Sequence, residues 1–454
     1  MTLLDLPHLL EPALWTYLSE GKANLCVRYQ GPDEDYKDTV LRVRKCPLNT
    51  EQEPPHSPTS QDIQGRYAEE IIGPLLGSSL VPPSLLLRVH ADFLYALEEA
   101  IYCERPIHRR HQSILTSQPH ATLLPDLTAT SSSWPAMSME IKPKWGFLPK
   151  SRNISQERAI KRRVCRHCLK TRSLQGLGKP SSSYCPMDLY SIDSARMHKA
   201  LISLYSDPPS NRLTFFREGK VCSKDAALDQ QAISLCKEAL PPTFPLNALG
   251  QPMAWSMVWD AVREALSVSS LLPELRKHQE RLYGLSIEGS SSLYQDPETA
   301  KLALDAWGSM SAWKESLDAY LSRHPDEDGK TLPARVHRLL QQCMAATLQD
   351  LSIMITLHPG PMPVDHGKKL HIYGRKGMYL PPKSPKSIFP RVYFPIQTYV
   401  GETHVLKWYC RVSVVDLDPK PVTRIPHWDA LDRDIAIAAS SSSSPHTFSC
   451  TPPL

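Results

Sequence analysis

The sequence lacks the features that mark several specialised classes of protein. No internal repeat is present, and no apolar run approaches the roughly 18 residues that a membrane-spanning helix needs. The net charge is only +5 over 454 residues, so the surface as a whole is not that of a nucleic-acid binder. Eleven cysteines are scattered without a disulfide framework, and Asp5 and Pro7 interrupt a short apolar start that lacks the basic flank of a signal peptide. We therefore expect a soluble, intracellular chain with reduced thiols.

Proline and serine are abundant instead. The 42 prolines and the runs of serine mark places where compact structure gives way to loops, while 41% hydrophobic residues suffice for two or three packed domains. The stretches that we predict to be loops or insertions are residues 51–62, 112–135, 176–183, 241–252 and 359–390. The tail from Ser440 cannot bury enough apolar surface to order itself, so we expect disorder there.

Residues 140–149 form the most informative segment. A short apolar run typical of a buried strand ends at Ile141, and two lysines separated by a proline follow. On an extended strand, Lys142 and Lys144 project to one face, which Glu140 shares, so two ammonium groups can converge on one polyanion. The alternative is a solvated edge strand. The pattern predicts a phosphate-binding site.

The same segment reads Glu-Ile-Lys-Pro-Lys-Trp-Gly-Phe-Leu-Pro and resembles the signature of the inositol-pentakisphosphate 2-kinases. Three further matches follow the family's order, at residues 21–25, 350–355 and 416–421. The resemblance implies a kinase that uses ATP and magnesium to phosphorylate the 2-hydroxyl of inositol 1,3,4,5,6-pentakisphosphate, giving inositol hexakisphosphate, which is phytic acid. Four collinear motifs are far more specific than any one of them.

The resemblance also implies a fold. We expect an α+β protein with a two-lobed inositol-polyphosphate-kinase-like fold, distantly similar to protein kinases. The predicted division is an N-lobe over residues 1–128 that covers the nucleotide, a C-lobe over 129–438, and a disordered tail over 439–454. Hydrophobic patterns predict strands at 24–29, 39–44, 351–355 and 412–415, and helices at 64–76 and 334–348. The early strand, strand, helix order is how a kinase N-lobe covers ATP phosphates.

For the nucleotide, a loop with small residues precedes the strand at 24–29. Small side chains let backbone N–H groups approach phosphates, although an isolated loop of this kind is more often only a turn. Arg42 stands where a protein kinase keeps its strand lysine, and a hinge is expected near the end of a short apolar strand at 123–126. By resemblance, the nucleotide-binding residues are Gly21, Ala23, Asn24, Arg42, Asp126 and Glu140.

Two aspartates match the catalytic and metal-binding positions of the family. Phosphoryl transfer to an alcohol needs a group that orients the hydroxyl and accepts its proton, and Asp350 matches the family's residue in that role. Asp416 ends a predicted buried strand and matches the ligand of magnesium, which prefers carboxylate oxygens. Asp418 is a possible helper. Lys142 is expected near the transferring phosphoryl group, with no covalent enzyme intermediate.

The substrate itself requires a dense group of cations. Five phosphates carry a charge of about −7 to −10, which calls for convergent Arg and Lys side chains. If a helix follows Pro421, the spacing of Lys420, Arg424 and Trp428 places all three on one helical face. By resemblance, the substrate-binding residues are Arg109, Lys142, Lys144, Asn211, Lys420, Arg424 and Trp428.

The chain departs from the family pattern at two substrate segments. Relatives have an Asn-Asn-x-Arg segment, whereas this chain reads Ser-Asn-Arg-Leu at 210–213, so only Asn211 is carried over and Arg212 is shifted. The basic segment 161–172 should supply another phosphate ligand, but no residue in it matches unambiguously.

A zinc site is not expected from the cysteines. Cys165 and Cys168 form one close pair with Cys185 downstream, whereas a structural zinc usually takes four ligands as two close pairs. Some plant relatives hold zinc in an inserted loop, but the corresponding stretch here, 221–349, has only three dispersed cysteines. We interpret the close pair as ordinary cysteines on a basic helix.

Two other functions remain open. The altered Asn-Asn segment and the long insertions leave room for a catalytically weak scaffold that binds inositol polyphosphates. RNA binding by the basic segments 105–111 and 161–172 is less favoured, because aromatic residues for base stacking are sparse there. We expect a monomer in the nucleus or cytoplasm, with no nucleic-acid or membrane partner.

Overall fold

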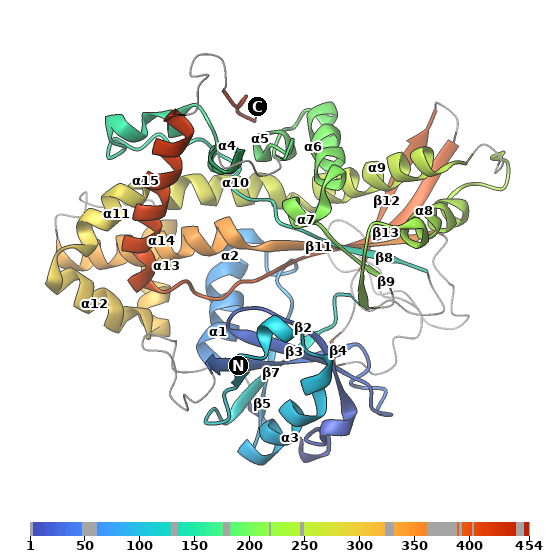
Figure 1. The fold of residues 1–454 in the computed structure, drawn as a ribbon, viewed down its shortest axis with the longest axis horizontal. Coiled ribbons are helices and arrows are strands. Elements are labelled where there is room, and N and C mark those ends of the chain that lie inside the picture. Colours follow the sequence, from blue (N-terminus) through green and yellow to red (C-terminus); the bar gives the residue numbers. More distant parts are fainter. Residues whose placement is uncertain are drawn as a thin grey trace.

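The computed structural model of the protein describes residues 3–47, 61–128, 135–175, 182–217, 219–245, 249–322, 331–360, 388–389, 393–401, 404–441 and 449–453. They form a mixed α+β structure with two separate sheets and many helices (Figure 1). The predicted loops at 51–62, 176–183 and 359–390 lie mostly outside these residues. No helix in the described ranges is both long enough and apolar enough to cross a bilayer.

The first sheet is built from the N-terminal quarter of the chain. Its strands are β1 (Leu3–Leu4), β2 (Trp15–Glu20), β3 (Asn24–Tyr29), β4 (Thr39–Pro47), β5 (Leu85–Arg88), β6 (Gln112–Ile114) and β7 (His120–Pro125). They are ordered β1-β5-β7-β4-β3-β2, and β6 pairs with β4. Buried and half-buried residues alternate along β3, as a sheet with one covered face requires. Helix α3 (Ala91–Ile101) packs its apolar side against this sheet.

The strand pair predicted at 24–29 and 39–44 is confirmed, whereas the interpretation of residues 112–135 as an insertion is wrong. That stretch contains β6 and β7, and β7 lies between β5 and β4. The reason is the run Ala121–Leu123, whose side chains are buried in the sheet despite the prolines and serines around them.

The predicted helix at 64–76 is also confirmed. It consists of α1 (Gln61–Tyr67), a wider turn at Ala68–Ile72 and α2 (Gly73–Leu76), and it ends at Gly77, which has a φ of 100°. The apolar side chains of this helix belong to the hydrophobic core of the second sheet and its helices, while α1 also contacts β5 and β7 of the first sheet. The Tyr67 hydroxyl lies 3.4 Å from the hydroxyl of Thr347.

The second sheet is antiparallel and buried. Its strands are β8 (Met137–Ile141), β9 (Thr214–Arg217), β10 (Lys220–Cys222), β11 (Ser352–Pro359), β12 (Phe394–Val400) and β13 (His404–Val415). Their order is β10-β9-β8-β11-β13-β12. Every residue of β11 is buried, because neighbouring strands flank it and helices pack against it.

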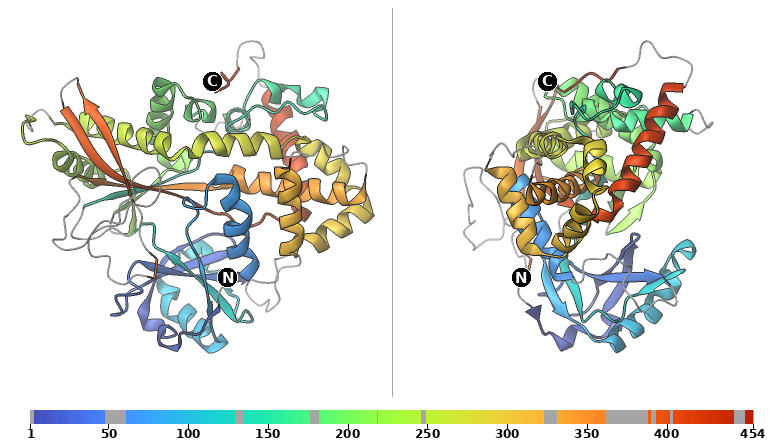
Figure 2. Two further views of the ribbon diagram at one scale, coloured as in Figure 1. Left: turned by 180° about the vertical axis from the view of Figure 1, so that it is seen from behind. Right: turned by 90° about the vertical axis from the view of Figure 1, so that its left-hand side faces the viewer.

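Helices surround this sheet and extend to one side of it (Figure 2). They are α4 (Arg166–Gln175), α5 (Pro186–Leu189), α6 (Ser194–Ser206), α7 (Pro208–Asn211), α8 (Ala226–Ala239), α9 (Gln251–Ser269), α10 (Leu271–Leu282), α11 (Ser286–Tyr294), α12 (Pro297–Trp307), α13 (Met310–Leu321), α14 (Leu332–Asp350) and α15 (Ile425–Ser441). Single 3-10 turns occur at Pro7–Leu9, Pro12–Leu14, Tyr102–Glu104, Ile107–Arg109 and Val422–Arg424, and a longer 3-10 helix spans Gln156–Arg162.

Helix α14 is central to the helical region and delivers a key aspartate. The Thr331 hydroxyl caps its start by accepting the N–H of Ala334, and its apolar face packs against α10, α11, α12 and α13. The helix predicted at 334–348 is thus confirmed, and it continues to Asp350. The next strand, β11, begins at Ser352.

The C-terminal tail differs from the prediction. Helix α15 continues to Ser441, residues 442–448 lie outside the described part, and residues 449–453 pack on the protein. Cys450 is buried because it contacts the apolar side of α4 and α15, so the expectation of disorder over the whole tail is wrong at this segment.

Candidate active site

The sheet register brings the two predicted catalytic aspartates to one edge. Strands β11 and β13 run antiparallel, with Ser352 opposite Val415. Asp350 comes just before the start of β11, and Asp416 follows the end of β13 directly. Their positions are therefore set by backbone pairing deep in the core rather than by a flexible loop.

Lys142 connects these acids. Its Nζ donates to Asp416 Oδ2 at 2.7 Å, to Ser352 Oγ at 2.7 Å and to the backbone oxygen of Asp350 at 3.2 Å. Ser352 in turn donates to Glu140 Oε1 at 2.6 Å. Burial disfavours the charged ammonium, but the nearby carboxylates, Asp416 first, outweigh it and raise the pKa of Lys142. This lysine is therefore a fixed cation between the carboxylates.

Both aspartates are ionised at neutral pH. Burial alone would raise the pKa of Asp350, but Lys420, whose Nζ lies 3.0 Å from Oδ2, lowers it below the usual value. Burial also opposes ionisation of Asp416, and Lys142 and Arg42 overcome that effect, so its pKa is lowered too. Each side chain keeps more than half of its surface exposed. Asp350 can therefore accept a proton, and Asp416 can bind a hard cation.

Strained backbone accompanies these groups. Asp416, Lys144 and Arg212 have φ values of 62°, 63° and 56°, in the left-handed region that side chains disfavour. The turn at Lys144 also corrects the sequence interpretation, since β8 ends at Ile141. Lys142 and Lys144 therefore do not share a strand face, and they approach the site from different directions.

Asp418 connects the two sheets. Its carboxylate accepts hydrogen bonds from Asn24 Nδ2 at 3.1 Å and from the guanidinium of Arg42. Burial alone would raise the pKa of Asp418. The nearby guanidinium of Arg42 has the larger opposite effect, so the pKa of Asp418 is lowered overall. Asn24 and Arg42, which were predicted to bind the nucleotide, thus lie beside the Asp416 loop, and their side chains are already bonded to Asp418.

A cavity of about 870 Å³ opens beside Asp350. Its size falls within the range of ligand sites, roughly 300–1000 Å³. Seven basic side chains line it against two carboxylates, Asp350 and Asp432. The basic residues are Lys22, Lys144, Arg166, Lys170, Arg212, Lys420 and Arg424. Trp145 and Trp428 form an aromatic part of the cavity wall. This excess of positive charge suits a ligand with several negative groups.

A second cavity of about 430 Å³ adjoins the first. Glu140 and Lys142 line it, and Arg212 lines both cavities. The predicted groups Glu140 and Lys142 therefore line a cavity that shares part of its wall with the large one.

The structure brings together most of the predicted substrate residues. Lys420, Arg424 and Trp428 line the large cavity because a helical turn at Val422–Arg424 leads into α15. Lys144 lines it too. Lys22, in the loop between Gly21 and Ala23, reaches it from the first sheet, and a side chain added at Gly21 would meet no atom within 4 Å. This loop therefore borders open space.

Three predicted residues are placed elsewhere. Asn211 is buried, and its Nδ2 donates to the backbone oxygens of Ser203 and Leu204, which fixes the end of α6. Asp126 is buried and accepts from Arg28 Nε at 2.5 Å. Arg109 lies in the turn Ile107–Arg109, between α3 and β6 in the chain, and is not among the residues that line the two cavities. Neither Asn211 nor Asp126 offers its side chain to a ligand in this arrangement.

Sequence reasoning missed the cations of α4. His167, Lys170, Thr171 and Leu174 line the large cavity at helical spacing, and Arg166 joins them. Within the described part of the chain, Lys170, Arg212 and Arg424 have no side-chain hydrogen bond or ion pair. Helical periodicity in the segment 161–172 was a usable signal, but it did not show which face met the cavity.

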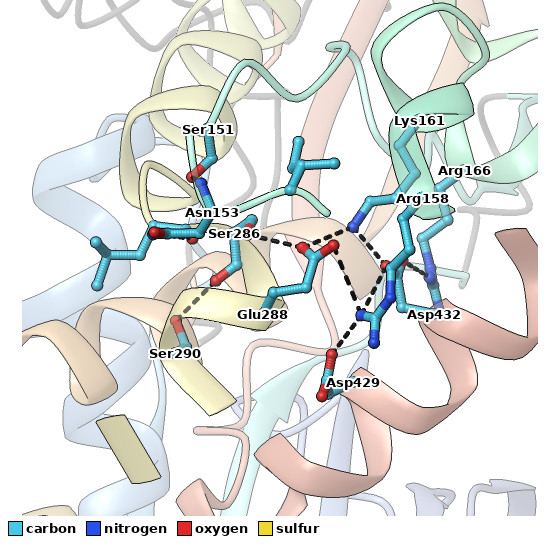
Figure 3. A network of polar contacts seen from close by, with 12 residues as sticks. Ser151, Asn153, Arg158, Lys161, Arg166, Ser286, Glu288, Ser290, Asp429 and Asp432 are labelled. Carbon is cyan, nitrogen blue, oxygen red and sulfur yellow. Dashed lines mark hydrogen bonds and ion pairs between the residues drawn. The ribbon is translucent and has the colours of Figure 1, made fainter. Parts of the chain in front are cut away.

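Basic residues at the start of this segment and just before it are buried in an ionic network (Figure 3). Lys161 Nζ lies 2.5 Å from Asp432 Oδ2 and 3.1 Å from Glu288 Oε2, and Arg158 Nη1 lies 2.5 Å from Asp429 Oδ1. Asp432 also holds Arg166 at 2.5 Å. The network therefore joins α15 and α11 to the wall of the cavity.

We expect this network to matter for stability. Replacing Asp432 by alanine leaves Lys161 with one counter-charge instead of two, so the free energy of unfolding should fall by about 3 kcal/mol. Urea denaturation checks this. Asp434→Ala on the same helix is the control, because that side chain is exposed and should change the value by less than about 0.5 kcal/mol. Equal effects of the two changes would contradict the assigned role.

Comparison with known proteins gives one consistent family. The family model described as inositol-pentakisphosphate 2-kinase matches residues 17–434. The chain is 26% identical to the inositol-pentakisphosphate 2-kinase of Danio rerio, over 93% of this chain and 92% of that protein. It is 27% identical to the Arabidopsis thaliana protein of the same name, over 75% of this chain and 80% of that protein. The family match contains both aspartates and all seven basic residues of the large cavity.

Proposed function

The chain belongs to the inositol-pentakisphosphate 2-kinase family and is a transferase with that activity, and from this premise we propose how its residues perform the reaction. The donor is ATP and the acceptor is the 2-hydroxyl of inositol 1,3,4,5,6-pentakisphosphate. The product is inositol hexakisphosphate. We further propose that the two sheets are the centres of two lobes in an inositol-polyphosphate-kinase-like fold.

The observation that carries this proposal is the charge of the large cavity. Seven basic side chains against two carboxylates match a ligand with five phosphates and a charge of about −7 to −10. Asp350 lies at the edge of that cavity and is ionised. A hydroxyl between the phosphates of a bound substrate would therefore face a carboxylate, while the phosphates face cations.

Each group then has one role. Asp350 accepts a hydrogen bond from the 2-hydroxyl and takes its proton as the new P–O bond forms. Lys142, held by Asp416 and Ser352, places its ammonium beside the transferring phosphoryl group and neutralises charge there. The attack is in line, and no covalent enzyme intermediate forms.

Magnesium and ATP fit the remaining groups. Asp416 and Glu140 offer the carboxylate oxygens that magnesium prefers, and a bound ion would neutralise charge on the ATP phosphates. The backbone N–H of Ala23 would hold a phosphate, and open space borders Gly21. Gly21 would contribute by its small size, because its own N–H already donates to the backbone oxygen of Asn24 at 2.9 Å. Asn24 and Arg42 would contact the nucleotide after exchanging their bonds to Asp418. Asp126 would take part only through its backbone, because its side chain is buried.

The direct test is turnover by the purified protein with ATP, magnesium and inositol pentakisphosphate. We expect ADP and inositol hexakisphosphate in equal amounts. Tight binding of the pentakisphosphate with no consumption of ATP would instead identify a binding scaffold. RNA binding is opposed by the burial of Arg105 and Lys161, each of which lies in an internal ion pair.

The wider setting is also a proposal. We propose a monomeric enzyme of the nucleus or cytoplasm, without nucleic acid or membrane as a partner. The eleven cysteines are scattered through the sequence without a disulfide framework, which supports a reducing compartment.

Lys144 gives substrate binding a predicted pH dependence. Burial, together with the charges of Lys142, Arg212 and Lys170, lowers the pKa of Lys144 to about 8 against the pull of Asp350. A polyanion favours the ammonium form, so binding takes up a proton above pH 8, and affinity should fall by up to about tenfold per pH unit there. Calorimetric titration at several pH values measures this.

Two variants test whether Lys144, rather than another lysine, causes this pH dependence. Lys144→Arg stays charged and should retain its affinity above pH 8, whereas Lys150→Arg at an exposed position should keep the wild-type profile. An unchanged pH profile in Lys144→Arg would refute the assignment.

In the absence of substrate, the folded chain releases the proton of Lys144 near pH 8 and the unfolded chain only near 10.5. Lys144 therefore makes the free energy of unfolding rise with pH between those values.

A further inference from the structure

Four cysteines from distant parts of the chain meet at one point behind α4. The Sγ atoms of Cys165, Cys168, Cys185 and Cys450 all lie within 4.8 Å of one another, and all four are free thiols. Cys165 precedes α4, Cys168 lies in its first turn, Cys185 precedes α5 and Cys450 belongs to the C-terminal segment. The sequence prediction of no zinc site here is therefore wrong about the number of ligands, because the fourth comes from a residue almost 300 positions away.

We propose that these four thiolates hold a structural zinc ion. Tetrahedral Zn–S bonds of about 2.3 Å place the sulfurs about 3.8 Å apart, which is compatible with four sulfurs that all lie within 4.8 Å of one another. A site of four sulfurs so close together suits a single ion and leaves no room for an iron–sulfur cluster. The Cys-x-x-Cys pair at the start of a helix is a usual half of such a site.

The surroundings of the sulfurs suit thiolate ligands. The N–H of Cys165 points to Cys450 Sγ at 3.4 Å, and the N–H of Cys168 points to Cys165 Sγ at 3.5 Å. Apolar side chains pack around the group, including Val164, Leu169 and Met187. The site is closed, with no position open to substrate, as in structural rather than catalytic zinc sites.

The C-terminal segment is fixed to this point by further bonds. The N–H of Cys450 donates to the backbone oxygen of Arg163 at 2.9 Å. Arg196 of α6 donates to the backbone oxygens of Thr451 and Pro452 at 2.7 and 3.1 Å. This explains why the end of the chain lies against α4 and α5 (Figure 1). Cys450 therefore arrives as a ligand that the fold positions.

The zinc site supports the wall of the large cavity. Helix α4 turns Cys168 and Leu169 toward the sulfurs, and it turns His167 and Lys170 toward the cavity. Tyr184, next to Cys185, donates its hydroxyl to the backbone oxygen of Pro143 at 2.9 Å, directly before Lys144. The ion would thus fix α4 and the Lys144 turn together. This consequence for the substrate rests on the proposed function, whereas the metal site does not.

The first test is the metal content of the wild-type protein, measured by mass spectrometry after dialysis against a weak chelator. We expect one zinc per chain, released when the thiols are modified. Cobalt replacing the zinc should show the absorption of a tetrahedral thiolate site. After denaturation with a chelator and no reductant, all eleven thiols should react. A chain that holds neither metal, or that shows fewer reactive thiols because of disulfides, would overturn the proposal.

The second test compares two cysteine variants. Cys450→Ser should lose most of its zinc and lower the melting temperature, whereas Cys103→Ser, at an exposed position far from the group in sequence, should keep both. Retention of a full zinc in Cys450→Ser, with an unchanged cobalt spectrum, would contradict the four-sulfur site. If Cys450→Ser fails to fold, the wild-type measurements still decide.

A third measurement addresses the cavity wall. Cys450→Ser should raise the dissociation constant for inositol pentakisphosphate more than that for ATP. Because metal content is independent of catalysis, an inactive wild type that holds zinc would refute only the proposed function. An active wild type without zinc would refute only the metal site.

Discussion

Replacing Asp350 by asparagine should lower turnover by about 10²–10⁴-fold, because the amide cannot take the proton of the acceptor hydroxyl. The side chain is exposed and its shape is preserved, so folding should be unaffected. Affinity for inositol pentakisphosphate should stay the same or rise, since the change removes a negative charge and frees Lys420 from its 3.0 Å ion pair. Single-turnover kinetics and calorimetry measure the two effects separately.

The control for this change is Asp434→Asn, an exposed aspartate on α15 outside both cavities. It should leave turnover and affinity unaltered. Full turnover by Asp350→Asn would remove Asp350 from the mechanism. Loss of affinity without loss of turnover would indicate that the carboxylate only organises Lys420.

Replacing Asp416 by asparagine should lower turnover by about 10³-fold, equivalent to about 4 kcal/mol of transition-state stabilisation. Two effects combine, since the change removes the proposed magnesium ligand and releases Lys142 from its 2.7 Å ion pair. The loss should persist at saturating pentakisphosphate and be partly offset by excess magnesium. Initial rates over a range of magnesium concentrations measure this.

A neighbouring carboxylate supplies the matched control. Asp418 lies two residues further on, and its Oδ2 accepts hydrogen bonds from Asn24 and Arg42. Asp418→Asn should therefore act mainly through the affinity for ATP, with a smaller effect on turnover at saturating ATP. A reversed order, with Asp416→Asn active and Asp418→Asn inactive, would exchange the roles of the two aspartates.

The sequence predicts the positions of the acids well because each lies at an end of an apolar run. The runs after Asp350 and before Asp416 have the length and composition of buried strands, and the structure forms β11 and β13 there. The two strands pair with each other and so bring the acids to one edge of the sheet. No local sequence pattern predicts this long-range pairing. The family motifs carried that information instead.

The basic residues show where local patterns fail. Helical spacing placed Lys420, Arg424 and Trp428 together correctly, because a helical turn does follow Pro421. The same kind of reasoning could not tell Lys161 from Lys170. Lys161 is buried because Asp432, 271 residues away, pairs with it, and Lys170 faces the cavity. The partner of a charge decides its role, and the partner is distant in sequence.

Backbone conformation and distant ligands account for the other differences. Lys142 and Lys144 do not share a face, because the strand ends at Ile141 and Lys144 adopts a left-handed conformation. Asn211 matches a substrate residue in sequence, yet it caps α6. The proposed zinc ligand Cys450 stands alone after a serine-rich stretch, where composition alone predicts disorder.

The most direct test of the account is the structure of the protein bound to inositol 1,3,4,5,6-pentakisphosphate. We expect the ring in the large cavity, with phosphates on Lys144, Lys420 and Arg424 and the 2-hydroxyl within hydrogen-bonding distance of Asp350. A ring bound elsewhere, or one with its 2-hydroxyl turned away from Asp350, would contradict it.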